Sequence, residues 1–350
     1  MSGIMAAPAL AVTGVGMVAG VGLDCQAACA AIRCAIDNFQ ETHFVDAAGE
    51  RILGCEVPLG MPWRGRPRLL RMAADALAQA VQDHGDVDIG ATPLLLCLAE
   101  PERPGRIVDD DAAFLAALAR LLQQPLHPHS AVVATGRTAA GIALLRAREL
   151  LASGAVPRVL IVAADSMLSA ATLAWHEARS RLNTSTNPNG FIPGEAAAAL
   201  VIERAGGAGQ LACTGIGVGH EAAHVLSGEP LRADGLCQAI RAALADAGCA
   251  MHDVAFRISD MSGEQYYFKE AALALLRLLR QRRATFDLWH PADCVGEVGA
   301  AAGLVAICVV RMACLKGYSA GPRVLAQLGG DAGARVALVL EWRAQGSGHG

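Results

Sequence analysis

The stretch GFIPGEAAAALVIE, residues 190–203, decides the fold. Its glycines lead into a short, continuous apolar run with no polar alternation, which is typical of a central strand covered on both faces. The run PRVLIVAADS, residues 157–166, has the same character. We therefore expect buried central strands in an α/β protein. At the entry to the first run, we expect Gly194 to supply a tight turn and Glu195 a structural hydrogen bond.

Strand and helix patterns alternate outward from this stretch. In the first half, strands are expected at 9–18, 92–100, 130–135, 157–166 and 195–203, and helices at 24–36, 68–85, 110–124 and 138–154. In the second half, strands are expected at 211–219, 254–260, 285–290, 323–330 and 335–342, and helices at 235–248, 269–283 and 298–312. The similar order of elements predicts a duplication.

The two predicted halves are residues 1–205 and 206–343, and a flexible, glycine-rich tail is expected at 344–350. No linker rich in proline or serine separates the halves, so we expect them to pack as one body. The apolar opening, residues 1–23, lacks a basic segment and is interrupted by glycines. It therefore favours a strand and a turn over a signal peptide or a membrane anchor.

Composition narrows the functional classes. The 350-residue chain has a formal net charge of −4, so it offers no basic excess for nucleic acid. Its eleven cysteines form no C-x-x-C pair, which favours free thiols in a cytoplasmic protein. Metal sites at Cys25, Cys29 and Cys34 or at His127 and His129 are alternatives that packing and loop structure explain better. We expect no metal and no cofactor.

Five segments carry a family resemblance: TGVGMVAGVGLD (13–24), SGAVPRVLIVAADSMLSAATLAW (153–175), GFIPGEAAAALVIE (190–203), GLCQAIRAALADAGCAMHDVAF (235–256) and GEVGAAAGLVAI (296–307). In this order they resemble motifs of the β-ketoacyl-[acyl-carrier-protein] synthases of the thiolase superfamily. The resemblance spans nearly the whole chain. It implies a thiolase-like fold, in which two duplicated α/β halves pack as a five-layered αβαβα body.

The resemblance also locates a catalytic triad. In this family a cysteine at a helix N-terminus takes the acyl group as a thioester, and two histidines assist decarboxylation of the malonyl group. Here the cysteine position falls on Arg137, the first histidine on Asp260 and the second on Glu297. The resemblance therefore implies a degenerate member that has lost the Cys-His-His triad.

The residues around Arg137 offer no replacement nucleophile. Thr135, Gly136 and Thr138 fall on the family's oxyanion and turn positions. A guanidinium stays protonated in proteins, so Arg137 cannot attack an acyl group. A shift of one position in the alignment would bring Gly136 or Thr138 into the slot, and threonine without an adjacent base is a poor nucleophile. We therefore lean towards a protein that is not an enzyme.

The three replacements bring one cation and two carboxylates to positions that meet in the family's fold. We hypothesise that Arg137 lies between Asp260 and Glu297 and donates hydrogen bonds to both carboxylates. The alternative is that the three charges face solvent separately. Burial of each charge alone is the least favourable arrangement, because each would cost several kcal/mol.

Two further clusters are candidate partner surfaces. The basic cluster could dock an acidic carrier protein, or it could be a solvated helix start; it comprises Trp63, Arg64, Arg66 and Arg68. The aromatic pair Tyr266 and Tyr267 could anchor an interface or could pack in the core.

Three functions remain open. The one we favour is a non-catalytic binding protein: an adaptor or chaperone-like factor, such as one for a secreted effector. The alternatives are a partner subunit of an active ketosynthase, resembling chain-length factors, and an atypical acyltransferase. The shortened region between Glu100 and Ala131 and the short turn at 183–189 argue against an acyl tunnel. Expected partners are an adaptor target, an intact ketosynthase or an acyl carrier protein, in a homo- or heterodimer through residues 130–135, with neither nucleic acid nor membrane.

Overall fold

A computed structural model describes residues 8–344 of the chain; residues 1–7 and 345–350, and with them almost all of the expected tail, lie outside the described part. The strands are β1 (Leu10–Ala19), β2 (Gln40–Val45), β3 (Arg51–Gly54), β4 (Leu94–Cys97), β5 (Ala131–Val133), β6 (Arg158–Ser166), β7 (Glu195–Arg204), β8 (Gln210–His220), β9 (Phe256–Ser259), β10 (Leu288–Trp289), β11 (Arg323–Gly329) and β12 (Ala334–Arg343). The α-helices are α1 (Cys25–Arg33), α2 (Gly65–His84), α3 (Asp111–Leu122), α4 (Ala139–Ala152), α5 (Ala170–Glu177), α6 (Asp234–Ala247), α7 (Gln265–Leu278), α8 (Ala292–Val295) and α9 (Ala302–Leu315). Short 3₁₀ turns are η1 (Gly136–Thr138), η2 (Met251–Asp253) and η3 (Gly299–Ala301).

The strand order repeats between the two halves. The first half contributes β5-β4-β6-β7-β1 and the second contributes β10-β9-β11-β12-β8. In each block the first two pairings are parallel and the last two are antiparallel. The blocks join through a short antiparallel contact between Leu10–Val12 of β1 and Leu211–Cys213 of β8. The repeated topology agrees with the duplication expected from the sequence.

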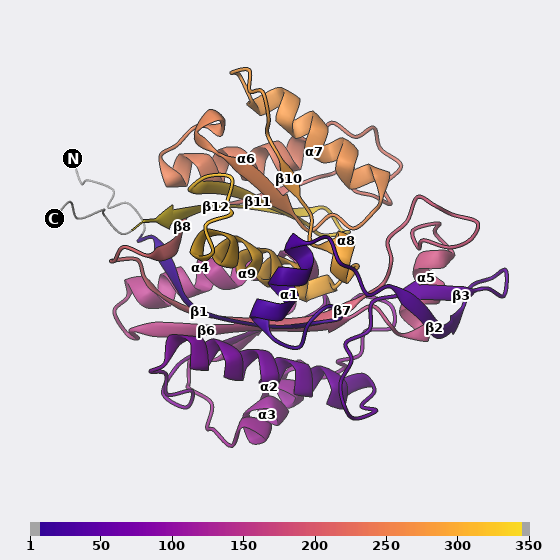
Figure 1. Cartoon of the computed structure of the whole chain (residues 1–350), viewed down its shortest axis with the longest axis horizontal. Helices are drawn as coiled ribbons and strands as arrows, with labels where there is room; N and C mark the ends of the chain where they lie inside the picture. Colours follow the sequence, from indigo (N-terminus) through magenta and orange to yellow (C-terminus); the bar gives the residue numbers. More distant parts are fainter. Residues whose placement is uncertain (1–7, 345–350) are drawn as a thin grey trace.

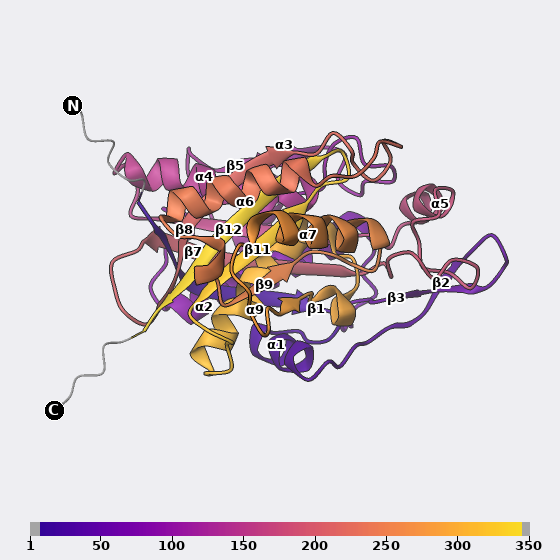
Figure 2. The same ribbon diagram turned by 90° about the horizontal axis from the view of Figure 1, so that it is seen from above.

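The layers follow from this topology, and the five-layered arrangement is confirmed (Figure 1). Helices α2 and α3 cover the outer face of the first sheet block (Figure 1), and α6 and α7 cover that of the second (Figures 1 and 2). Helices α4 and α9 lie between the blocks. The middle layer explains why α9 is buried almost all round: a helix between two sheets has no solvent-facing side.

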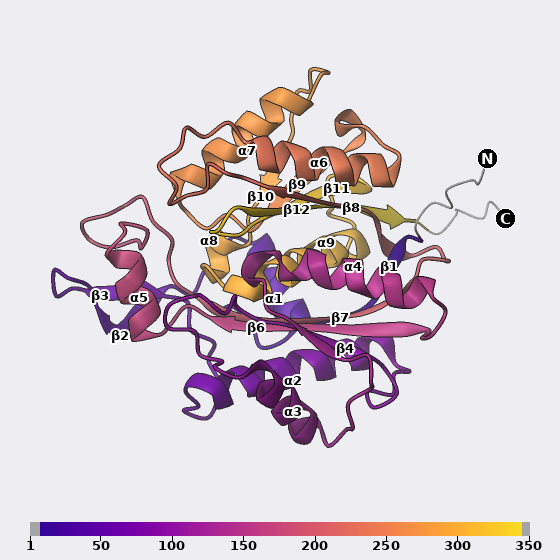
Figure 3. The same ribbon diagram turned by 180° about the vertical axis from the view of Figure 1, so that it is seen from behind.

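The structure adds elements that the hydrophobic pattern did not predict. Strands β2 and β3 form a hairpin beside α5, to one side of the layers (Figure 3). The hairpin has no continuous apolar run in its sequence, because it buries only one face, mainly through Thr42 and Ile52. Helix α7 begins four residues before its expected start, at Gln265, and so includes both tyrosines. Within residues 8–344 no helix is long and apolar enough to cross a bilayer.

Candidate functional site

The candidate site lies where α4 and α9 begin. Each helix is preceded by a 3₁₀ turn whose first residue has a left-handed backbone, Gly136 with φ +56° and Gly299 with φ +55°. A Cβ on Gly136 would lie 2.1 Å from Oε2 of Glu100, and one on Gly299 would lie 2.0 Å from Oδ2 of Asp165. Both the backbone conformation and the close carboxylate therefore require glycine at these turns.

The structure brings Arg137, Asp260 and Glu297 together. Nη1 of Arg137 lies 3.0 Å from Oε2 of Glu297, and its Nε lies 3.7 Å from Oδ2 of Asp260. The Arg137 guanidinium also covers the ring of Tyr267, with its carbon 4.3 Å from the ring centroid. Arg137 is 7% exposed and both carboxylates are buried, which excludes separate solvation of the three charges.

One detail of the hypothesis needs correction. The second hydrogen bond from Arg137 goes to Asp331, with Nη2 3.2 Å from Oδ1, and not to Asp260. The Asp260 carboxylate instead accepts the N–H of Gly329 at 2.9 Å and the hydroxyl of Ser259 at 3.4 Å. These contacts hold the Asp260 carboxylate at the ends of β9 and β11, and it acts on Arg137 by charge alone.

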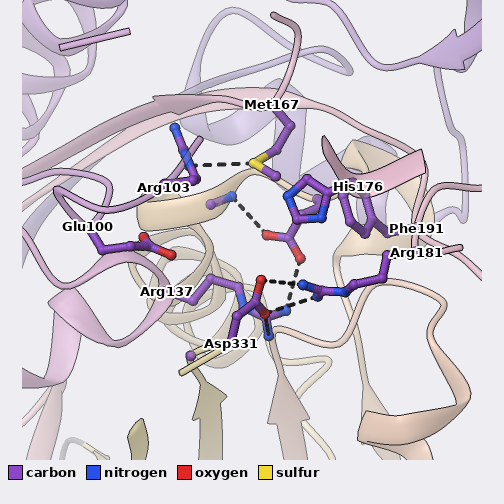
Figure 4. A pocket seen from close by; sticks show the side chains of 11 residues that line it. Glu100, Arg103, Arg137, Met167, His176, Arg181, Phe191 and Asp331 are labelled. Carbon is purple, nitrogen blue, oxygen red and sulfur yellow. Dashed lines mark hydrogen bonds and ion pairs between the residues drawn. The ribbon is translucent and has the colours of Figure 1, made fainter. Parts of the chain in front are cut away.

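A second arginine, which the sequence analysis missed, shares the same carboxylate. Arg181 pairs with both oxygens of Glu264, at 2.7 and 2.8 Å, and with both oxygens of Asp331, at 2.6 and 3.0 Å. Figure 4 shows Arg137 and Arg181 pointing at Asp331 from two sides. Burial opposes ionisation there, but the two guanidinium groups hold the pKa of Asp331 well below its usual range. Asp331 belongs to the segment LGGDAGAR, in the turn between β11 and β12.

Carboxylates also accept hydrogen bonds from the backbone N–H groups at the turn that opens α9. Oε1 of Glu297 accepts the N–H of Gly299 at 2.9 Å, and Oδ2 of Asp165 accepts the N–H of Ala300 at 2.8 Å. Asp165 is held in turn by Arg103, whose two terminal nitrogens each lie 2.6 Å from one carboxylate oxygen. The helix terminus favours negative charge, so these acids have a structural role at this position.

Burial perturbs the titratable groups of the site. It raises the pKa of Asp260 to about 6, even though Arg137 acts in the opposite direction. Burial also raises the pKa of Glu100 and of Glu264. His176 is 2% exposed, and burial, reinforced by Arg181, lowers its pKa to about 3. Neither ring nitrogen of His176 has a hydrogen-bond partner among the described residues.

The space between these side chains is small. The cavity that they enclose measures about 20 Å³, enough for one water molecule but not for an acyl chain. Its described lining contains no cysteine, serine, threonine or lysine; the residues are Glu100, Arg103, Arg137, Met167, His176, Arg181, Phe191, Glu297, Gly299, Gly330 and Asp331. Across residues 8–344 no group of three or more His, Cys, Asp or Glu side chains could hold a metal ion.

The turn residues beside Arg137 are satisfied within the turn. The N–H of Gly136 donates to the carbonyl of Leu98 at 3.1 Å, and the hydroxyl of Thr138 donates to the carbonyl of Thr135 at 2.9 Å. The Gly136 N–H is therefore already engaged with the backbone. Thr135 caps the 3₁₀ turn Gly136–Thr138, and the oxyanion role of these residues stays a prediction.

Only part of the candidate basic surface is exposed to solvent. Trp63 is 43% exposed and Arg64 is exposed, whereas Arg66 is half-buried over the ring of Phe114. Arg68 has to be removed from the predicted partner surface, because it is buried and donates to the Glu195 carboxylate. This pair meets the expectation of a structural role for Glu195.

The two tyrosines differ in burial. Tyr267 is 4% exposed, supports Arg137 and donates its hydroxyl to Asp331 at 2.6 Å. Tyr266 is half-buried and donates its hydroxyl to the carbonyl of Ala223 at 2.7 Å. Tyr267 therefore packs in the core, and a partner contact of the half-buried Tyr266 stays a prediction.

Comparisons with solved structures define the class of fold. No family model matches the sequence, and the comparison with curated proteins gives no match. The ishigamide ketosynthase/chain length factor aligns with a TM-score of 0.81 and 18% identity, covering 96% of this chain and 100% of that chain. A ketosynthase in complex with its chain length factor from Xenorhabdus doucetiae aligns with a TM-score of 0.72 and 13% identity, covering 98% and 100%. A β-ketoacyl synthase from Burkholderia phymatum aligns with a TM-score of 0.74 and 16% identity, covering 97% and 100%. The chain thus has the thiolase-like fold of ketosynthases.

Proposed function

We propose that this chain is a non-catalytic, ketosynthase-like protein that works by binding a protein partner. The observation that carries the proposal is Arg137, which occupies the position assigned to the nucleophile and is fixed by Glu297 and Asp331. A cation in this place has no lone pair to attack an acyl group. The cavity beside it has no space for a substrate chain.

The partner that we favour on this evidence is an intact ketosynthase. Two of the structural neighbours are themselves described as a ketosynthase with a chain length factor, which makes a heterodimer a specific candidate. A second partner class is an acyl carrier protein, since one neighbour is described as such a protein in complex with its ketosynthase. Exposed Trp63 and Arg64 would offer an aromatic and a cationic contact to an acidic carrier protein.

The competing function is an adaptor or chaperone-like factor for an unrelated protein, including a secreted effector. The small cavity favours this function, because a subunit that shapes an acyl product needs a tunnel and an adaptor does not. We place the protein in the cytoplasm under either function. All cysteines of the described chain are free thiols, which suits a reducing compartment.

The partner is identified by purification of the tagged full-length chain from its native host, followed by mass spectrometry and light scattering. An intact ketosynthase at equal stoichiometry supports the partner subunit, and an unrelated protein at equal stoichiometry supports the adaptor. The Trp63→Ala/Arg64→Ala variant is the matched test of the carrier-protein surface. This variant should lose the binding of an acyl carrier protein and keep the binding of a ketosynthase or an unrelated partner.

Catalysis is tested separately with labelled acyl and malonyl carrier proteins. We expect the intact mass of the chain to stay unchanged and no carbon dioxide to be released. A covalent acyl adduct on any residue would contradict the non-catalytic proposal, whichever partner is found.

A further inference from the structure

A second cavity lies at the edge of the second sheet block, beside β10 and the end of α1. It measures about 380 Å³ and shares no lining residue with the cavity around Arg137. Its walls are mainly apolar and include Ile32, Leu288 and Val309. This volume lies in the range of small-molecule sites, which is about 300–1,000 Å³.

Three aromatic rings and a guanidinium form a column along this cavity. Phe256 lies against Trp289, with ring centroids 4.2 Å apart, and it is fully buried. Trp289 and Tyr318, which both line the cavity, are nearly parallel, with centroids 6.5 Å apart and planes 25° apart. The Arg33 guanidinium carbon lies 4.2 Å from the centroid of Tyr318. The buried Phe256 fixes Trp289, so the column presents a rigid aromatic platform.

The charges at the rim select the sign of a ligand. Arg33 ends α1, and within residues 8–344 its guanidinium makes no ion pair and no hydrogen bond. The acid of the rim, Asp293, already pairs with His290, with 2.7 Å between Oδ2 and Nδ1. Arg33 is therefore the cation at the mouth whose N–H groups remain available to an anion.

We infer that this cavity binds a small planar aromatic anion, such as an aryl carboxylate. Its ring would pack against the edges of Trp289 and Tyr318 that line the cavity, and its carboxylate would accept hydrogen bonds from Arg33. The two requirements are independent, because the rings select a flat apolar group and the arginine selects a negative charge. The inference does not depend on the proposed partner-binding function.

The test is isothermal titration of the full-length chain with 2-naphthoate. Matched probes are 2-naphthamide, which keeps the ring without the charge, and cyclohexanecarboxylate, which keeps the charge without the aromatic ring. We expect saturable binding of 2-naphthoate that is stronger than that of either probe. Arg33→Gln should lower the affinity for 2-naphthoate by about tenfold and leave the affinity for 2-naphthamide unchanged, because the variant loses one charge-assisted contact.

Two further variants isolate the platform. Tyr318→Leu should weaken both aromatic probes, and Arg280→Gln, at an exposed arginine outside the cavity, should change nothing. The inference is overturned if 2-naphthoate does not bind saturably, or if cyclohexanecarboxylate binds as tightly. Equal 2-naphthoate affinity in wild type and Arg33→Gln overturns it as well. If Tyr318→Leu fails to fold, Arg33→Gln alone decides the result.

Discussion

Nη1 of Arg137 lies 3.0 Å from Oε2 of Glu297, although 160 residues separate the two in the sequence. The contact joins equivalent places of the two repeats, because Arg137 lies in the turn that opens α4 and Glu297 lies just before the turn that opens α9. An ion pair here therefore ties the first half of the chain to the second at its centre.

Arg137→Ala should destabilise the protein by about 3–5 kcal/mol, because it leaves buried carboxylates without their cation. The measurement is urea unfolding followed by circular dichroism near neutral pH. Arg64→Ala, at an exposed cation, is the matched control and should stay within about 0.5 kcal/mol of wild type. A loss for Arg137→Ala as small as that of the control would mean that the cluster contributes nothing to stability.

Coupling between the two charges is a separate prediction. The double variant Arg137→Met/Glu297→Gln should lose less free energy of unfolding than the sum of its single variants, because each single change leaves one charge buried and unpaired. The double-mutant cycle should give a coupling of about 0.5–3 kcal/mol. Strict additivity would show that the contact at 3.0 Å is energetically silent.

Gly136→Ala should lower the free energy of unfolding by more than the left-handed backbone of Gly136 alone explains. Gly65 has almost the same backbone, with φ +55°, but nothing lies within 4 Å of a Cβ there. Gly65→Ala should therefore cost about 1–2 kcal/mol from conformation alone. Gly136→Ala adds a collision with the Glu100 carboxylate, so its midpoint of urea unfolding should fall further.

A second substitution separates these two contributions. Glu100→Ala should recover the collision part of the Gly136→Ala loss and leave the conformational part. If Gly136→Ala and Gly65→Ala prove equal, the Glu100 carboxylate gives way freely, and Gly136 is required only by its backbone.

The parts of the molecule that local pattern encodes were predictable from the sequence. The apolar runs that became β6 and β7 specify buried strands by themselves, and the motif order located Arg137 and Glu297. The contact of Arg137 with Asp331 spans 194 residues and joins a turn to a loop, so no local pattern encodes it. The prediction that Arg68 belongs to a partner surface was wrong for the same reason. A basic run indicates solvent exposure, and the partner that buries Arg68, Glu195, lies 127 residues away in the sequence.

Asp260→Asn should stabilise the protein above about pH 6 and change little near pH 4. The folded-state pKa of Asp260 is about 6, above its ordinary value of 3.8, so the native state retains a proton that the unfolded chain releases in this window. The contribution of Asp260 to the free energy of unfolding is fully present below pH 3.8 and is lost as the pH rises through about 6. The difference is worth on the order of 3 kcal/mol at high pH.

The measurement for Asp260→Asn is urea unfolding of both proteins from about pH 4 to about pH 8, with the difference plotted against pH. His176 titrates in the same window with the opposite sign, but it is present in both proteins and cancels in the difference. A difference that does not rise with pH would show that Asp260 ionises as freely in the folded protein as in the unfolded chain.

His176→Leu should stabilise the protein by about 1–2 kcal/mol near neutral pH, because it removes two buried ring nitrogens that have no partner in the described chain. Leucine is close to histidine in volume and keeps an apolar contact with Phe191, whose ring centroid lies 4.9 Å from that of His176. The gain should grow as pH falls from 6.5 towards about 3, since the unfolded chain takes up a proton in that range and buried His176 does not. His84 is the control, because its Nε2 lies 3.2 Å from Glu203, and His84→Leu should lose stability. Urea unfolding of the two variants decides the point: a loss for His176→Leu as large as that for His84→Leu would mean that the buried imidazole does have a polar partner in solution.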